Sequence, residues 1–306
     1  MRVLFMGTPE FAIPSLDAIF HQHTLLAVIT APDKPAGRGH QLHVSPVKSY
    51  CLKHNIPVLQ PKNLKSESFL KKITHLNPDI NVVVAFRMLP TVLINLPKFG
   101  SINLHASLLP KYRGAAPIQR AIMQGETVTG LTVFKLAPEI DTGDLVNAIE
   151  LPIGLDETGG ELHDRMAKLG APLLIKSLKE IETNTAIFKV QNECIASPAP
   201  KIFKEDCRID WAQPTFKIYN LIRSLIPYPC AWFSQNGKLF KVHKALKIIQ
   251  THALDSGTWL LETDSLKIAT CDGFIQILEI QPEGKRKMTA IEFINGIQRR
   301  EINKPE

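Results

Sequence analysis

Short β-rich runs alternate with helical patterns over the first part of this 306-residue chain. Strands are predicted at residues 3–6, 25–30, 80–85, 102–105, 131–136 and 145–149. Alternation of this kind is typical of a mostly parallel sheet wrapped by helices. It predicts an α/β domain at the start of the chain.

A long helix is expected to begin near Thr158 and to close this first domain. Thr158 and Glu161 have the spacing of a capping box, in which each side chain bonds to the backbone amide of the other residue. Apolar residues then recur at helical spacing and predict one buried face: Leu162, Met166, Leu169, Leu173, Leu174, Leu178 and Ile181.

The chain changes character at residues 196–201, whose small residues and prolines are typical of a linker. One short helix is predicted beyond it, at 215–225, followed by β runs at 239–242, 246–249, 258–261 and 274–280 with turn signals between them. Several short strands of this kind favour a small closed or nearly closed β-barrel. We expect two domains, residues 1–203 and 204–306.

Composition excludes several classes of protein. An apolar content of 44% with 21% charged residues describes a globular chain with sizeable cores, not a disordered one. Residues 2–6 form too short an apolar run for a signal peptide, and no later run is expected to span a membrane. The five cysteines are scattered without a C-x-x-C pair, which predicts reduced thiols in a cytoplasm and no structural zinc.

The formal net charge of +7 favours a polyanionic partner such as nucleic acid. An ordinary solvated surface explains the same charge equally well. The first turn, Gly7-Thr8-Pro9, supplies one glycine where a dinucleotide-binding fingerprint needs three, so NAD binding is not expected.

Polar residues interrupt the predicted strand at 102–105. Side chains two positions apart share a face of a strand, so Asn103 and His105 should project together while Ile102 and Leu104 face the other way. An amide beside an imidazole suits a reaction in which negative charge develops on a carbonyl oxygen. The alternative is that both side chains only satisfy loop backbone groups.

The residues after this strand favour a binding site over that alternative. Residues 108–114 predict an extended, proline-stiffened segment that could wall a pocket for a flat heteroaromatic ligand. Ser107 lacks the G-x-S-x-G elbow of a nucleophilic serine. Asp141, in the turn-rich loop after residue 136, is the best candidate for a carboxylate partner of His105, although a simple Asp-Thr-Gly turn is an equal reading. No metal site is expected beside His105.

These residues resemble the folate-dependent formyltransferase family, whose pattern Asn-x-His-x-Ser-Leu-Leu-Pro is matched by Asn103, His105 and residues 107–110. The downstream Asp-x-Gly-Asp of the family is matched at 141–144. Residues 5–12, 32–39, 113–118 and 208–211 resemble the family members that act on tRNA. The likeness thus covers nearly the whole chain.

The resemblance implies a Rossmann-like catalytic domain joined to an OB-like barrel. It implies that the chain, as a monomer, moves the formyl group of 10-formyltetrahydrofolate to the amino group of methionine carried by initiator tRNA, without a metal. Asn103 and His105 would hold the developing oxyanion while Asp141 assists proton transfer. The folate site would be lined by Ser107, Leu108, Leu109 and Pro110.

For tRNA, the resemblance points to the insertion at 31–48, which carries Lys34, Arg38 and Lys48, with glycines at 37 and 39. Cations of the second domain at 241, 244, 247 and 285–287 could follow a phosphate backbone. The chain departs from the family at Phe86-Arg87, where a tyrosine-glycine pair is usual, so the loop there is expected to take another path.

Other formyltransferases share the Asn, His and Asp pattern, namely those acting on glycinamide ribonucleotide or sugar nucleotides, and formyltetrahydrofolate hydrolases. The insertion and the barrel argue for tRNA instead of a small acceptor. A non-catalytic RNA-binding protein with a degenerate formyltransferase domain is the alternative outside the enzymes.

Overall fold

The computed structural model describes the chain except residues 37–40 and 303–306, and it describes the backbone alone at 34–36, 41–43 and 297–302. The chain forms two compact units. The first comprises residues 1–117, 128–152 and 163–200, and the second comprises 118–127, 153–162 and 201–306.

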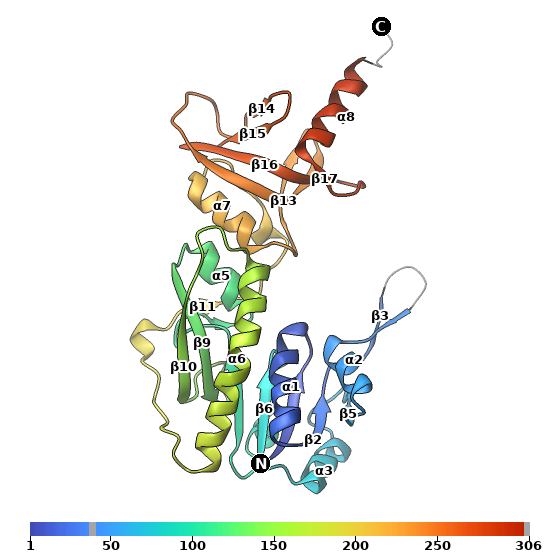
Figure 1. Cartoon of the computed structure of the whole chain (residues 1–306), viewed down its shortest axis with the longest axis vertical. Helices are drawn as coiled ribbons and strands as arrows, with labels where there is room; N and C mark the ends of the chain where they lie inside the picture. Colours follow the sequence, from blue (N-terminus) through green and yellow to red (C-terminus); the bar gives the residue numbers. More distant parts are fainter. Residues whose placement is uncertain (37–40, 303–306) are drawn as a thin grey trace. The chain divides into compact units, whose positions relative to one another are not determined.

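The first unit is built on a seven-stranded sheet in the order β10-β9-β7-β6-β1-β2-β5 (Figure 1). Its strands are β1 (Arg2–Gly7), β2 (Thr24–Ile29), β5 (Val58–Leu59), β6 (Ile80–Val84), β7 (Ser101–His105), β9 (Val128–Lys135) and β10 (Leu145–Pro152). The five strands β7, β6, β1, β2 and β5 pair in parallel, and β9 pairs antiparallel with both of its neighbours, β7 and β10. This confirms the predicted mostly parallel sheet.

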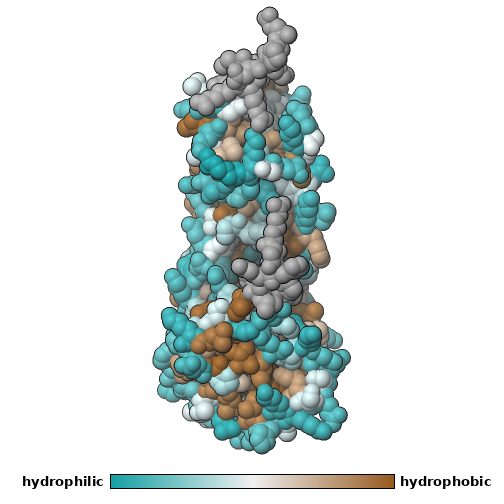
Figure 2. Space-filling model, turned by 90° about the vertical axis from the view of Figure 1, so that its right-hand side faces the viewer, coloured by the Kyte–Doolittle hydropathy of each residue, from teal (hydrophilic) through white to brown (hydrophobic). Residues whose placement is uncertain are grey.

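All five residues of β6 are buried. Continuous burial of this kind is typical of a parallel strand whose sheet is covered by helices on both faces. The helices of this unit are α1 (Ile13–Gln22), α2 (Pro46–Lys53), α3 (Glu67–Leu76), α4 (Thr91–Ile94) and most of α6 (Gly159–Glu182), whereas α5 (Pro117–Met123) belongs almost wholly to the second unit. Some apolar side chains still reach the surface. Met88 is 66% exposed and Val92 53%, and Figure 2 shows apolar residues gathered in the lower part of that view.

The start of α6 follows the sequence prediction. Thr158 donates its backbone N–H to Glu161 Oε2 at 2.9 Å, and Thr158 Oγ1 accepts from the Glu161 N–H at 3.2 Å. The predicted buried face is correct except at Leu169, which is 37% exposed. That residue lies at the edge of the apolar stripe, whose centre is shifted toward Leu174 and Ile181.

The prediction of a linker at 196–201 was wrong for residues 198 and 199. Strand β11 (Pro198–Ala199) pairs in parallel with β8 (Arg113–Gly114), so these two residues belong to the first unit. A proline is compatible with such a short edge strand, where its missing N–H leaves no ladder bond unmade.

The second unit carries a separate antiparallel sheet, as expected. Its strands β12 (Ala231–Gln235), β13 (Lys238–Ile249), β16 (Gly273–Pro282), β15 (Leu266–Ala269) and β14 (Trp259–Leu261) pair in that order, and β17 (Met288–Thr289) pairs with β16. Helices α7 (Thr215–Ser224) and α8 (Ala290–Ile302) belong to the same unit. The two β runs predicted at 239–249 are one strand, β13, with register shifts between 242 and 245.

Candidate active site

His105 ends strand β7, at the edge of the sheet where the parallel strands finish. Its Nε2 lies 2.8 Å from the carbonyl oxygen of Tyr112. A carbonyl oxygen can only accept, so Nε2 carries the hydrogen. The other ring nitrogen, Nδ1, faces Asp141 Oδ2 at 3.7 Å, and the two side chains are 8% and 12% exposed. The structure therefore brings together the histidine and the carboxylate that the sequence nominated.

Asp141 lies in the loop between β9 and β10, with a left-handed φ of +56°. Aspartate tolerates this conformation better than most residues. Its Oδ2 accepts the backbone N–H of Gly114 at 2.8 Å. The position of the carboxylate is thus set by the hydrogen bond from Gly114 and by the left-handed backbone of Asp141 itself.

Gly114 has no room for a side chain. A Cβ there would lie 2.6 Å from the carbonyl oxygen of Ala199, and its φ is +127°. Glycine is therefore what allows β8 to approach β11 while its N–H points at Asp141.

Asn103 stands in the middle of β7, opposite Phe134 of β9, and is half-buried. Leu104 packs against α6, where its Cδ2 would lie 2.5 Å from a Cβ at Gly170. In the part of the chain that the structure describes, the Asn103 amide makes no hydrogen bond. The two N–H groups of this amide are therefore unengaged in that part of the chain.

The segment from Ser107 to Pro110 follows His105 directly. Ser107 is buried, and its Oγ donates to the Lys111 carbonyl at 2.6 Å, which leaves no free hydroxyl for a nucleophile. Leu108 is half-exposed and packs on Gly130. Leu109 and Pro110 are buried.

Thr132 holds this segment and was missed by the sequence analysis. Its Oγ1 donates to the Ser107 carbonyl at 2.7 Å and accepts from the Leu109 N–H at 3.1 Å. A hydroxyl within the apolar strand at 131–136 was the available signal, of the same kind that singled out Asn103.

Arg87 defines the path of the loop that departs from the family pattern. Its guanidinium donates to the carbonyls of Pro61 and Lys62, at 2.5 and 3.1 Å. A cavity of about 470 Å³ lies alongside, lined by residues 62–65, 87–91 and Pro138. Its lining includes none of Asn103, His105 or Asp141, but Pro138 belongs to the same loop as Asp141.

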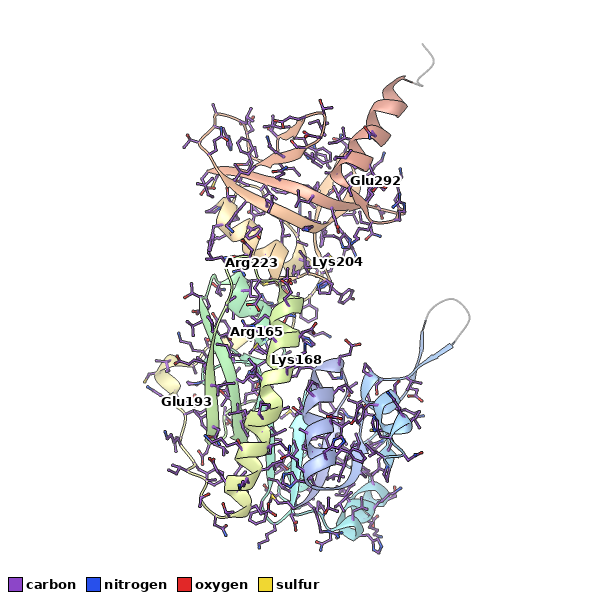
Figure 3. All side chains as sticks on the ribbon, viewed as in Figure 1. Arg165, Lys168, Glu193, Lys204, Arg223 and Glu292 are labelled. Atoms are coloured by element: carbon purple, nitrogen blue, oxygen red, sulfur yellow. The ribbon has the colours of Figure 1, made fainter. Side chains whose placement is uncertain are left out.

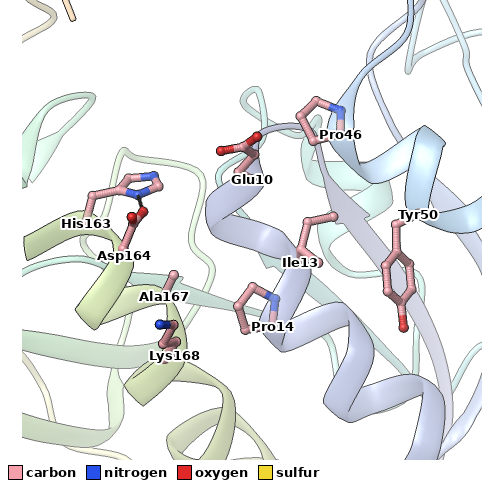
Figure 4. A pocket seen from close by; sticks show the side chains of 9 residues that line it. All are labelled: Glu10, Ile13, Pro14, Pro46, Tyr50, His163, Asp164, Ala167 and Lys168. Carbon is pink, nitrogen blue, oxygen red and sulfur yellow. Dashed lines mark hydrogen bonds and ion pairs between the residues drawn. The ribbon is translucent and has the colours of Figure 1, made fainter. Parts of the chain in front are cut away.

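A second cavity of about 430 Å³ lies among α1, α2 and α6 (Figure 4). His163 Nδ1 and Asp164 Oδ1 meet at 2.9 Å on one side of it, and Tyr50 stands on the other. Its lining residues include none of Asn103, His105 or Asp141. It is therefore separate from the candidate site.

The insertion at 31–48 forms a hairpin of β3 (Lys34–Ala36) and β4 (Gln41–His43). At its base Lys48 is paired with Asp33, and this hydrogen bond, with one from Gln60, lowers the pKa of the Asp33 carboxyl. Arg38 lies outside the described residues, and of Lys34 only the backbone is described. Their tRNA contacts stay predictions.

Ion pairs engage three of the cations predicted to follow a phosphate backbone. Lys247 contacts Asp156 at 2.6 Å, Arg286 contacts Glu292 at 2.9 Å, and Lys287 contacts Glu279 at 2.7 Å. The other three, Lys241, Lys244 and Lys285, are exposed.

The described part of the chain offers neither a membrane-spanning helix nor a metal-binding cluster. No helix there has the length and apolar character needed to cross a membrane. Nor does any group of three or more histidine, cysteine or acidic side chains in that part meet the geometry of a metal site.

Comparison with known proteins links the chain to one family. Residues 1–178 match the family described as formyl transferase, and residues 201–298 match its C-terminal domain. The chain is 46% identical to a methionyl-tRNA formyltransferase of Flavobacterium johnsoniae and 42% identical to one of Bacteroides thetaiotaomicron. Each alignment covers 97% of this chain and 96% of the relative.

Solved structures share the fold. An N-formyltransferase of Helicobacter canadensis, in complex with folinic acid and dTDP-3-aminofucose, has a TM-score of 0.70 at 22% identity, over 94% of this chain and all of that one. A methionyl-tRNA formyltransferase of Clostridium thermocellum has a TM-score of 0.58 at 18% identity, over 80% and 93% of the two chains.

Proposed function

The chain belongs to the formyl transferase family, and from that premise we propose that it formylates the amino group of methionine carried by initiator tRNA. The observation that carries the reaction type is the juxtaposition of His105 and Asp141 at 3.7 Å beside the free amide of Asn103. The acceptor follows from the relatives named methionyl-tRNA formyltransferase, which align over 97% of the chain.

The formyl donor in this proposal is a reduced folate, 10-formyltetrahydrofolate. A folate has a flat heteroaromatic head and an anionic glutamate tail. The composition of the cavity beside Arg87 suits both, because Met88, Leu89 and Pro138 give it apolar walls while Lys62 and Lys65 add two cations to its lining. Leu108, half-exposed after β7, would complete the wall nearest His105 together with Ser107, Leu109 and Pro110.

In the proposed reaction the methionine amine attacks the formyl carbon, and negative charge develops on the formyl oxygen. The Asn103 amide donates a hydrogen bond to that oxygen. His105 Nδ1 carries no hydrogen and is the ring atom that can accept a proton, because its 3.7 Å separation from Asp141 exceeds a hydrogen bond, whereas Nε2 is held by Tyr112. Geometry of this kind often tightens when substrate binds.

One proton must leave the attacking amine, and one must reach the folate nitrogen that loses the formyl group. The pair of His105 and Asp141 is placed to move it, because an imidazolium formed at His105 faces the Asp141 carboxylate. The products are then a formamide on the methionine and tetrahydrofolate, so no further reactant is needed.

The test is an acceptor assay with purified protein and 10-formyltetrahydrofolate. We expect formylation of charged initiator tRNA and none of a sugar nucleotide or of glycinamide ribonucleotide. Formylation of the sugar nucleotide alone would replace this function with that of the Helicobacter enzyme. Binding of tRNA without any turnover would support the non-catalytic alternative.

The hairpin insertion is the part of the chain proposed to reach the acceptor end of the tRNA, through Arg38 and Lys34. Arg38→Ala should raise the KM for charged tRNA several-fold without changing the KM for the folate. An unchanged tRNA dependence would remove the insertion from the interface. We also propose a cytoplasmic monomer, which light scattering tests against the chain mass of 34.1 kDa.

A further inference from the structure

The segment at 191–199, here called the strap, joins the two catalytic loops although it lies far from both in sequence. It runs from Gln191 through η2 (Glu193–Ile195) to β11. All of it belongs to the first unit. The proposed reaction gives the strap no role, yet its side chains and backbone contact the neighbours of both His105 and Asp141.

Gln191 holds the backbone at Asp141 and just after it. Its Nε2 donates to the carbonyl oxygens of Asp141 at 2.9 Å and of Gly143 at 2.8 Å. The side chain is buried, with 5% exposure, so water does not replace these bonds if they are lost. Asp141 has a left-handed backbone, which persists only where its surroundings fix it.

Arg113 fixes the other end of the Gln191 amide. Its Nε and Nη2 donate to Gln191 Oε1 at 3.1 and 2.8 Å. The same guanidinium makes a bidentate pair with Glu193, at 2.8 and 2.6 Å. Glu193 projects from the strap in Figure 3. Gln191 therefore has one orientation, with its oxygen toward Arg113 and its NH₂ toward the Asp141 loop.

Ser197 holds the group that orients His105. Its Oγ accepts the N–H of Tyr112 at 2.9 Å, and its carbonyl accepts the N–H of Arg113 at 2.8 Å. Tyr112 has a left-handed φ of +60°, and its carbonyl oxygen is the partner of His105 Nε2. The strap thus fixes the acceptor that leaves Nδ1 facing the carboxylate.

We propose that the strap is a positioning element for the catalytic pair, and that Gln191 is the positioning residue that sets Asp141 against His105. The proposal rests on the proposed function, since it assigns Gln191 a role through a carboxylate that acts in that reaction. Gln191 touches no reacting atom and acts through the backbone at 141–143.

The test removes the hydrogen bonds of Gln191 and keeps its volume. Gln191→Met should lower kcat for tRNA formylation at least tenfold and leave the KM for charged tRNA within threefold. In the background of Asp141→Asn the same change should cost less than threefold, because the group that it positions is already disabled. An equal loss in both backgrounds would mean a general structural role and would overturn the proposal.

Two further variants separate positioning from folding. Gln191→Glu keeps the acceptor for Arg113 and loses the donors to the Asp141 loop, so it should show the same kcat loss. Asn192→Ala is the matched control. Asn192 is an exposed neighbouring amide whose side chain accepts only from Cys194 within the strap, so kcat should be unchanged. A normal kcat for Gln191→Glu would overturn the proposal.

Amide hydrogen exchange gives a readout independent of activity. The N–H of Gly114 is protected by Asp141 Oδ2, so Gln191→Met should speed its exchange, and Asn192→Ala should not. Unchanged exchange at Gly114 would refute the positioning role. If the wild-type protein formylates nothing, the proposed function fails, while faster exchange would still support the strap as the element that holds Asp141.

Discussion

Asp141→Asn removes the charge of the proposed catalytic carboxylate while keeping its shape and its hydrogen bond to the backbone. Asparagine tolerates the left-handed φ of +56° and can still accept the Gly114 N–H through Oδ1. We therefore expect a small change in stability, with Tm shifted by less than about 3 °C. What is lost is the attraction between the carboxylate and an imidazolium at His105.

The size of that loss follows from the geometry. Two unit charges 3.7 Å apart attract by about 4.5 kcal/mol at an effective dielectric constant of about 20. Partial solvation of the site reduces this to roughly 3 to 4 kcal/mol, which corresponds to a 10²- to 10³-fold fall in rate.

The assay is steady-state formylation of charged initiator tRNA with 10-formyltetrahydrofolate. We expect kcat to fall by about 10²- to 10³-fold, within the range of general acid–base catalysis, and the KM for tRNA to stay within about threefold. His105→Ala should lose at least as much. A kcat for Asp141→Asn within threefold of the wild type would refute the role of the carboxylate.

Three further predictions test other parts of the structure. Gly114→Ala should lower Tm by about 4 °C or more, measured by calorimetry, because its Cβ would lie 2.6 Å from the Ala199 carbonyl; an unchanged Tm would contradict the close approach. In native protein, Ellman's reagent should titrate two thiols at once, those of the exposed Cys194 and Cys271, and the buried three only after unfolding; five fast thiols would contradict the burial. Burial, together with a hydrogen bond to Asp156, raises the pKa of Tyr219 to about 12. The neutral tyrosine therefore contributes its whole share of the free energy of unfolding below about pH 10, the pKa of an unfolded tyrosine. That contribution falls as pH rises from about 10 toward 12, by up to about 2 kcal/mol. Tyr219→Phe should flatten that fall in chemical denaturation, and an identical pH profile would refute it.

The sheet and half of the site could be predicted because their signals are local. Strand periodicity placed Asn103 and His105 on one strand, and the structure has them on β7. The strands β3, β4 and β5 were missed because two or three residues give no period to read.

Gln191 could not be predicted because its role depends on partners far along the chain. Its contacts lie 50 residues away at Asp141 and 78 away at Arg113. In the sequence it is one polar residue in an irregular stretch. The strand at 198–199 could not be predicted for the same reason. Its prolines and small residues by themselves indicate a linker, and only the pairing with the distant strand β8 makes it a strand.

The pairing of β8 with β11 also sets an order of assembly during synthesis. Gly114 leaves the ribosome early, but its partner Ala199 follows only after the whole of α6. At about 5 to 20 residues per second, roughly 4 to 17 s separate the two. During that interval the contacts that the strap makes to Tyr112 and to the Asp141 loop are absent, so the proposed pair of His105 and Asp141 gains these supports only once about two thirds of the chain has been translated.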